Sequence, residues 1–341
     1  MKLLLTTVPG LEFIVREELA ELLGQVETAY TPLSGRVFAE IEEPLARILS
    51  MRSIENVRLI LGEGDTLRAT TEASLDAMKE LSKGLKTFAV RAERVTKEAP
   101  FTSLDLARDL GTLLSEKLGL QVQLDVPDIV FYAEYERGTY RVGVDLTPFS
   151  SLRDRPYRRW IHRSALNPII AYAMCRLAGS TGMLVDPFCG SGTIVLECLS
   201  LNTHREALCA DISVASLLGA RENAWAVGLT PHLYAQDVAN PALRENVAVD
   251  AIVTNPPFGL RERPVGGLER VYAALFSLAE KVLAEGGRLV VLTPHRELIQ
   301  RFSRLNAEKC IEINEGGLTS WIYVFSAAPG SSTPSLIRSP L

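Results

Sequence analysis

Apolar and polar positions follow two different periods along the first 62 residues. Stretches that alternate or are continuously apolar predict strands at residues 2–7, 36–41 and 57–61. Stretches with apolar residues three and four apart predict helices at residues 12–23 and 44–51. A succession of the β-α-β-β-α-β kind is typical of the ferredoxin-like arrangement, so residues 1–62 are predicted to form a ferredoxin-like domain.

Residues 63–150 repeat this mixture of periods. The pattern predicts helices over 73–85 and 103–118, the second beginning near Ser103 and ending at Gly119. It predicts strands over 87–92, 129–136 and 139–146, the last two joined by a hairpin at Arg137-Gly138. A second α+β domain is therefore expected here.

The remainder of the chain alternates strand and helix in a regular way. Apolar runs predict strands at residues 183–186, 207–211, 233–235, 250–254 and 288–293. Helical patterns fall at residues 167–177, 193–201, 213–227 and 268–283. Such alternation predicts an α/β domain with a doubly wound parallel sheet over residues 165–328, after a linker at 151–164. The Pro- and Ser-rich end, 329–341, is predicted to be disordered.

Composition places the chain among ordinary globular proteins. Of its 341 residues, 47% are hydrophobic and 23% charged, and the formal net charge is −5. No apolar run approaches the roughly 20 residues of a membrane span, and the first ten residues are too short and too soon broken for a signal peptide. We therefore expect a cytoplasmic protein that makes no membrane contact.

The cysteines and histidines show no metal-binding pattern. Five cysteines lie in apolar segments without a C-x-x-C pair, which argues against disulfides or a zinc site and favours a reducing compartment. The four histidines are scattered, so each is expected to be structural, and no metal is expected.

Positive charge is concentrated in one short segment. Residues 151–163 contain five arginines and one aspartate, whereas the regions on both sides are acidic. Arginines interleaved with aromatic residues suit phosphate contact and base stacking. The candidate RNA-binding residues are Arg153, Arg155, Tyr157, Arg158, Arg159 and Trp160. The alternative is a solvated linker whose arginines pair with acidic surfaces, and charge alone does not separate the two.

A Gly-rich turn follows the first strand of the predicted parallel sheet. Residues 183–194 read MLVDPFCGSGTI, in which Asp186 ends an apolar strand and Thr193 opens a helix. Gly190 and Gly192 let the backbone approach a ligand at the helix N-terminus. The turn is neither a Walker loop nor a G-x-G-x-x-G sequence, and an acidic residue before it suits an amine-bearing or cationic ligand.

Acidic residues recur where successive strands end. Asp211 ends the second strand and could accept both hydroxyls of a ribose, and Asp237 follows the third strand and could accept an adenine amine. Each acid alone is more often a turn residue or a helix cap. Their recurrence in step with the fold favours a nucleoside cofactor.

The fourth strand ends in Asn255-Pro256-Pro257-Phe258. Alone, this would be an ordinary turn, but at the end of a buried strand after the Gly-rich turn it resembles motif IV of amino-methyltransferases. The resemblance implies an exocyclic base amine as substrate, which is a poor nucleophile because its lone pair is delocalised into the ring. The Asn255 side-chain oxygen and the Pro256 carbonyl can accept its two hydrogens and aim the nitrogen, which is catalysis by positioning. Phe258 can stack on the target base once that base has left its helix.

DPFCGSGT and NPPF together resemble the motifs of Rossmann-type S-adenosylmethionine-dependent methyltransferases that act on amines. The resemblance implies S-adenosyl-L-methionine as cofactor and Asn255, Pro256 and Phe258 as catalytic residues. The implied cofactor contacts are Ala165, Leu166, Asn167, Asp186, Phe188, Gly190, Gly192, Thr193, Asp211, Asp237 and Asn255.

The region from FAVRAERVTKEAP to GTYRVGVDL resembles a THUMP domain, an RNA-binding module of tRNA-modifying enzymes. A ferredoxin-like unit, a THUMP domain and this catalytic domain, in that order, resemble the tRNA guanine-N2 methyltransferases. The resemblance implies tRNA as partner, and a monomer is expected. One branch acts on guanosine six of the acceptor stem and another on guanosine ten. The latter usually carries Asp at the position of Asn255, so guanosine six is favoured. The alternatives are a guanine-N2 methyltransferase of guanosine ten or ribosomal RNA, and a non-catalytic RNA-binding protein.

Overall fold

The structure, a computed structural model, describes residues 1–42, 44–162, 164–179, 182–201, 206–241, 248–259, 264 and 266–327. The chain forms two compact units. The first comprises residues 1–7, 15–31 and 36–152, and the second comprises residues 8–14, 32–35 and those from 153 onward. The tail predicted at 329–341 lies outside the described residues.

The first unit is built on an eight-stranded sheet with the order β2-β3-β1-β4-β8-β7-β5-β6. Its strands are β1 (Lys2–Thr6), β2 (Glu27–Ala29), β3 (Arg36–Glu40), β4 (Asn56–Gly64), β5 (Thr87–Arg94), β6 (Gln121–Val122), β7 (Ile129–Glu136) and β8 (Thr139–Asp145). The sequence predicts two regions with a boundary at residue 62. Antiparallel pairing of β4 with β8 joins these two regions in one continuous sheet.

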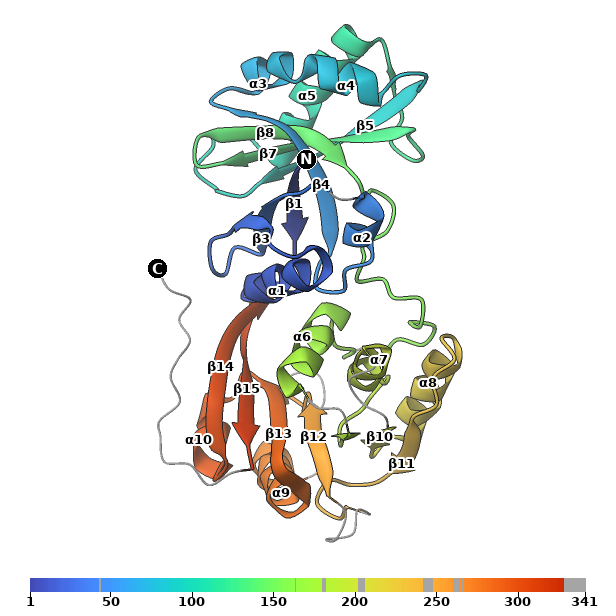
Figure 1. Cartoon of the computed structure of the whole chain (residues 1–341), viewed down its shortest axis with the longest axis vertical. Helices are drawn as coiled ribbons and strands as arrows, with labels where there is room; N and C mark the ends of the chain where they lie inside the picture. Colours follow the sequence, from blue (N-terminus) through green and yellow to red (C-terminus); the bar gives the residue numbers. More distant parts are fainter. Residues whose placement is uncertain are drawn as a thin grey trace. The chain divides into compact units, whose positions relative to one another are not determined.

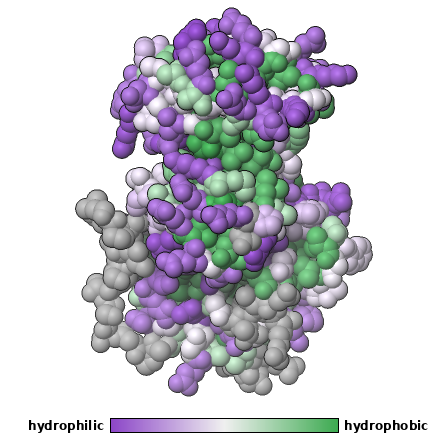
Figure 2. Space-filling view, turned by 45° about the horizontal axis from the view of Figure 1, so that its top comes forward, coloured by the Kyte–Doolittle hydropathy of each residue, from purple (hydrophilic) through white to green (hydrophobic). Residues whose placement is uncertain are grey.

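Amphipathic helices cover this sheet. They are α1 (Glu12–Leu23), α2 (Leu45–Leu49), α3 (Leu67–Ala73), α4 (Leu75–Leu81) and α5 (Ser103–Leu118). Leu106, Leu110 and Leu114 of α5 are buried against Phe88 and Phe131 of the sheet. The outer sides of α3 and α4 carry polar residues, in keeping with the mostly hydrophilic upper surface in Figure 2.

The helix predicted at residues 73–85 is present as the shorter α4, which begins at Leu75, while α3, which ends at Ala73, was not predicted. Hydroxyl groups of Thr70, Thr71 and Ser74 donate to the carbonyls four residues earlier, at 2.7–2.8 Å. Such back-bonding competes with the helical hydrogen bonds and bends or interrupts a helix.

The second unit contains a seven-stranded sheet with the order β11-β10-β9-β12-β13-β15-β14. Its strands are β9 (Met183–Asp186), β10 (Glu206–Asp211), β11 (His232–Ala235), β12 (Val249–Thr254), β13 (Leu283–Thr293), β14 (Asn306–Glu315) and β15 (Leu318–Ser326). The first five strands in this order are parallel, and β15 and β14 are antiparallel additions. The predicted α/β class with a doubly wound parallel sheet is confirmed. The hairpin of β14 and β15 was not predicted.

Helices lie on both faces of this sheet (Figure 1). They are α6 (Pro168–Ala178), α7 (Thr193–Ser200), α8 (Val214–Trp225), α9 (Gly267–Val282) and α10 (Arg296–Phe302). On β9, Leu184 belongs to the core formed with α6, α7 and α8, whereas Val185 belongs to the core formed with α9 and α10. The two-residue period of a strand therefore places successive side chains in two separate cores.

The expectation that the cysteines form no disulfides is wrong for four of them. The structure contains the disulfides Cys175–Cys198, between α6 and α7, and Cys189–Cys209, between the turn after β9 and β10. The two cysteines are 23 residues apart in the first disulfide and 20 in the second, so no short sequence motif indicates either pairing. Adjacent packing of α6 with α7, and of β9 with β10, brings the thiols together. Cys310 is buried and free.

Candidate active site

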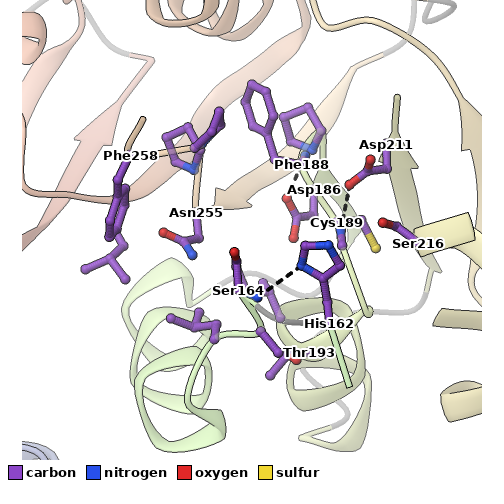
Figure 3. A pocket seen from close by; sticks show the side chains of 18 of the residues that line it. His162, Ser164, Asp186, Phe188, Cys189, Thr193, Asp211, Ser216, Asn255 and Phe258 are labelled. Atoms are coloured by element: carbon purple, nitrogen blue, oxygen red, sulfur yellow. Dashed lines mark hydrogen bonds between the residues drawn. The ribbon is translucent and has the colours of Figure 1, made fainter. Parts of the chain in front are cut away.

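One pocket lies where β9, β10, β11 and β12 end, within the second unit (Figure 3). Its volume of about 800 Å³ lies within the range usual for cofactor sites. Most of the predicted site residues line it: Ala165, Leu166, Asp186, Phe188, Gly190, Thr193, Asp211, Asp237, Asn255, Pro256 and Phe258. The carboxyl ends of parallel strands meet at one edge of a sheet, which explains why Asp186 and Asn255, 69 positions apart, line the same pocket.

The two glycines of the turn have different environments. Gly190 has a φ of +54°, and a Cβ atom there would meet nothing within 4 Å, so its missing side chain leaves open space on the pocket side. Gly192 has a φ of +82° and faces α8, where a Cβ would lie 3.2 Å from Cβ of Ala220. Gly190 therefore leaves room for a ligand, while Gly192 permits close helix packing and does not line the pocket.

Asp186 carries an unsatisfied acceptor atom. Its side chain is buried, and Oδ1 accepts from the Thr254 hydroxyl at 2.6 Å and from the Phe188 N–H at 3.0 Å. Oδ2 is buried without a hydrogen-bond partner among the described residues. Burial raises the pKa of Asp186 to about 7, and the neighbouring Asp211 charge acts in the same direction. A bound ammonium or sulfonium group would satisfy the orphaned oxygen and favour the ionised form.

Asp211 and Asp237 already hold backbone groups. Asp211 accepts from the Gly190 N–H through Oδ2 and from the Ser213 N–H through Oδ1, both at 2.8 Å. Asp211 thus fixes the Gly-rich turn as well as facing the pocket. Asp237 accepts from the Ala239 N–H at 2.9 Å and from the Arg270 guanidinium at 2.8 Å, and these two bonds lower its pKa.

Asn255 stands at the end of β12, and Figure 3 shows its side chain directed into the pocket. Its Oδ1 atom is buried and has no hydrogen-bond partner among the described residues. Buried polar atoms in folded proteins nearly always have a partner, so an orphan beside a pocket indicates a ligand donor. The side chain of Phe258 also borders the pocket.

Two of the predicted RNA-binding residues are buried. Arg155 donates to Oε1 of Glu197 on α7 at 3.0 Å, and the Tyr157 hydroxyl donates to the same oxygen at 2.7 Å. Burial of both side chains against a buried glutamate contradicts their assignment to RNA contact. Arg153 and Arg159 are exposed, while Arg158 and Trp160 are half-buried, and for all four RNA contact stays a prediction.

The segment that contains Trp160 packs against α8. A Cβ atom on Gly219 would lie 2.2 Å from the Trp160 ring, so only glycine allows this contact. Asn223 accepts from the backbone N–H groups of Arg159 and Trp160 at 3.0 and 2.8 Å. Residues 153–162 are therefore part of the second unit, and the idea of a solvated linker does not describe them.

Asn167 also departs from its predicted role. Its side chain accepts from the Ile169 N–H at 3.0 Å as the N-cap of α6, and it does not line the pocket. An Asn followed by a proline at the first helical position is a common helix start, and that signal was present in the sequence.

Several pocket residues were missed. His162 and Ser164 line it just before α6, and Ile313, Glu315, Leu318 and Ser320 line it from the hairpin of β14 and β15. Nδ1 of His162 accepts from the Ser164 N–H at 3.2 Å (Figure 3). The hairpin could have been found from the alternation of polar and apolar residues over 306–326.

The described part of the chain contains no cluster of side chains that could hold a metal ion. Nor does it include a helix with the length and apolar character that crossing a membrane requires.

Comparisons with known proteins agree with this architecture. The sequence profile of the RMKL-like methyltransferase domain matches residues 155–321, and that of the THUMP domain matches residues 66–145. The chain is 34% identical to a tRNA (guanine(6)-N2)-methyltransferase of Thermus thermophilus, covering 87% of this chain and 90% of the relative. It is 29% identical to a protein of the same name from Archaeoglobus fulgidus, covering 94% and 91%.

A solved structure is also similar over nearly its whole length. The crystal structure of TrmN from Thermus thermophilus matches with a TM-score of 0.82 and 29% identity, covering 95% of this chain and 99% of that one.

Proposed function

Because the chain belongs to the tRNA guanine-N2 methyltransferases that combine a THUMP domain with an RMKL-like methyltransferase domain, we propose that it methylates N2 of guanosine six in tRNA, with S-adenosyl-L-methionine as the methyl donor. Position six is supported by the names of the two relatives and by Asn255. The proposed domain division places the ferredoxin-like part at residues 1–62, the THUMP part at 63–150 and the catalytic part from 165.

The orphaned Oδ1 atom of Asn255 carries this proposal. An acceptor that is buried, unpartnered and beside an open pocket needs a donor, and an exocyclic amine supplies two N–H groups. Pro256 has no backbone N–H that could compete for that acceptor, and its ring restricts the turn.

The residues of this chain would act mainly by positioning the amine. S-adenosyl-L-methionine, when bound, supplies the electrophilic methyl group. Asn255 Oδ1 and the Pro256 carbonyl accept the amine hydrogens, which directs the nitrogen lone pair into the pocket. Phe258 offers a ring face to the extruded base. No strong base is required, because the amine loses its proton after transfer.

The orphaned Asp186 oxygen and the open space at Gly190 fit the cofactor. Asp186 would hold the ammonium group in the amino-acid part of the cofactor, and Asp211, which lines the same pocket, would accept from the ribose hydroxyls.

The affinity for S-adenosylhomocysteine should rise as the pH rises towards 7. In the free protein Asp186, with a pKa of about 7, is mostly protonated at lower pH, whereas a bound ammonium group requires the carboxylate. Binding therefore releases a proton below pH 7, and affinity should gain up to about tenfold per pH unit there. Calorimetry at several pH values in buffers of different ionisation heat measures this. Asp186→Asn should lose the slope, and a slope retained in that variant would remove Asp186 from the amine site.

Exposed arginines of the segment before α6 should contact tRNA phosphates. Replacing Arg153 and Arg159 together by Ala should weaken tRNA binding and reduce its salt dependence by about one logarithmic unit for each lost contact, because fewer counterions are released. Titrations of labelled tRNA at increasing salt measure the slope. Arg301→Ala, which removes an exposed arginine paired with Glu269 on α9, is the control. An unchanged slope in the double variant would exclude this segment from the RNA interface.

Methyl transfer to tRNA transcripts tests the function itself. We expect labelled methyl to enter a transcript that carries guanosine at position six. It should not enter a transcript in which adenosine replaces that guanosine and uridine replaces its base-pairing partner. Incorporation that instead depends on guanosine ten would place the chain with the other branch. No incorporation into any tRNA would contradict the proposal.

A further inference from the structure

A histidine outside the pocket contacts the loop that carries Asn255. His295 follows β13, and its Nε2 atom lies 2.9 Å from the backbone carbonyl oxygen of Phe258. Its Nδ1 atom lies 3.0 Å from Oε1 of Glu297 in α10. The imidazole therefore links the loop after β12 with the first turn of α10.

The ring of His295 is oriented by its surroundings. Its backbone N–H donates to the Thr293 hydroxyl at 2.9 Å, and that hydroxyl shares a 2.6 Å hydrogen bond with Tyr272 of α9. The Tyr272 ring meets the imidazole edge to face, with centroids 6.3 Å apart and planes at 89°. These contacts fix the orientation of the imidazole, with its Nε2 atom facing the Phe258 carbonyl oxygen.

Both partners of the imidazole are hydrogen-bond acceptors. A backbone carbonyl only accepts, and so does the ionised carboxylate of Glu297, whose side chain is well exposed. A neutral imidazole has one N–H and can donate to only one of them at a time, so the contact with Phe258 needs that N–H at Nε2.

Tyr272 and Arg296 also lie near the ring, and neither alters the competition of the two acceptors for its N–H. Burial raises the pKa of the Tyr272 phenol, so that group stays neutral. The Arg296 guanidinium packs over the Trp321 ring, 5.1 Å from its centroid. Among the described residues, Glu297 is the ionised group in contact with the imidazole.

We propose that His295 is a positioning residue for the reaction, and that donation from its Nε2–H to the Phe258 carbonyl holds the loop of Asn255 and Phe258 in its productive position. This inference rests on the proposed methyl transfer.

Substitution at position 295 separates this role from a purely structural one. His295→Ala should lower kcat by up to roughly 10²-fold with little change in KM for tRNA, because the loop shifts while the RNA interface stays. His295→Gln should restore most of kcat, since its amide N–H can reach the same carbonyl. His232→Ala, which removes an exposed histidine at the start of β11, is the matched control.

The outcomes distinguish the inference from the function on which it rests. A wild-type protein without methyl transfer would overturn the proposed function. An active wild type with an equally active His295→Ala variant would overturn only the role of His295. Equal loss in the Ala and Gln variants, together with lowered melting temperatures, would show that His295 acts through folding alone and would also overturn the inference.

Discussion

Replacing Asn255 by Ala should slow single-turnover methyl transfer by roughly 10²–10³-fold, equivalent to about 2.7–4 kcal/mol of barrier. The buried Oδ1 atom would meet only the target amine, which is a small part of a large RNA interface. Its hydrogen bond orients the amine during attack, so the rate should fall while the affinities for tRNA and S-adenosylhomocysteine change little.

Two further variants make this prediction specific. Asn255→Asp keeps an acceptor at the same place and should retain more activity than Asn255→Ala. Asn306→Ala removes an amide from β14, away from the pocket-lining end of that strand, and should behave as wild type. The assay uses labelled methyl donor and unmodified tRNA with enzyme in excess. A folded Asn255→Ala protein with the wild-type rate would remove Asn255 from the reaction.

Replacing Asp211 by Ala should weaken binding of S-adenosylhomocysteine by about 1.5–3 kcal/mol, or roughly 10- to 150-fold. The variant loses an ionised acceptor for the ribose hydroxyls and also frees the Gly190 N–H, which the carboxylate now holds at 2.8 Å. Binding of tRNA should stay close to normal. Asp76→Ala, which removes an exposed carboxylate of α4, controls for the change in net charge. Calorimetric titration measures the affinity, and an unchanged value in a folded variant would exclude Asp211 from the cofactor site.

The strands that build the site could be predicted because they are short, buried and apolar. Such strands end where polar residues begin, and a parallel sheet collects these ends at one edge. Asp186, Asp211 and Asn255 were therefore expected together, and they line one pocket. Their roles towards ligands stay predictions.

Features that depend on contacts between side chains far apart in the sequence could not be predicted in the same way. Arg155 and Tyr157 have the composition of an RNA-binding segment, but both side chains are satisfied by the buried Glu197, which lies 40 residues or more away in sequence. Nothing local in the sequence indicates that pairing. The same limit applies to the disulfides and to His295, whose contact with Phe258 spans 37 residues.

The central claim is that this chain transfers a methyl group to N2 of guanosine six in tRNA through the Asn255 loop. Nucleoside mass mapping of unmodified tRNA, after incubation with S-adenosyl-L-methionine and either wild-type or Asn255→Ala protein, tests it most directly. The account predicts N2-methylguanosine at position six with the wild type, and little or none with the variant in the same time. Methylation of another nucleotide or another atom of guanosine, or no methylation by the wild type, would contradict it.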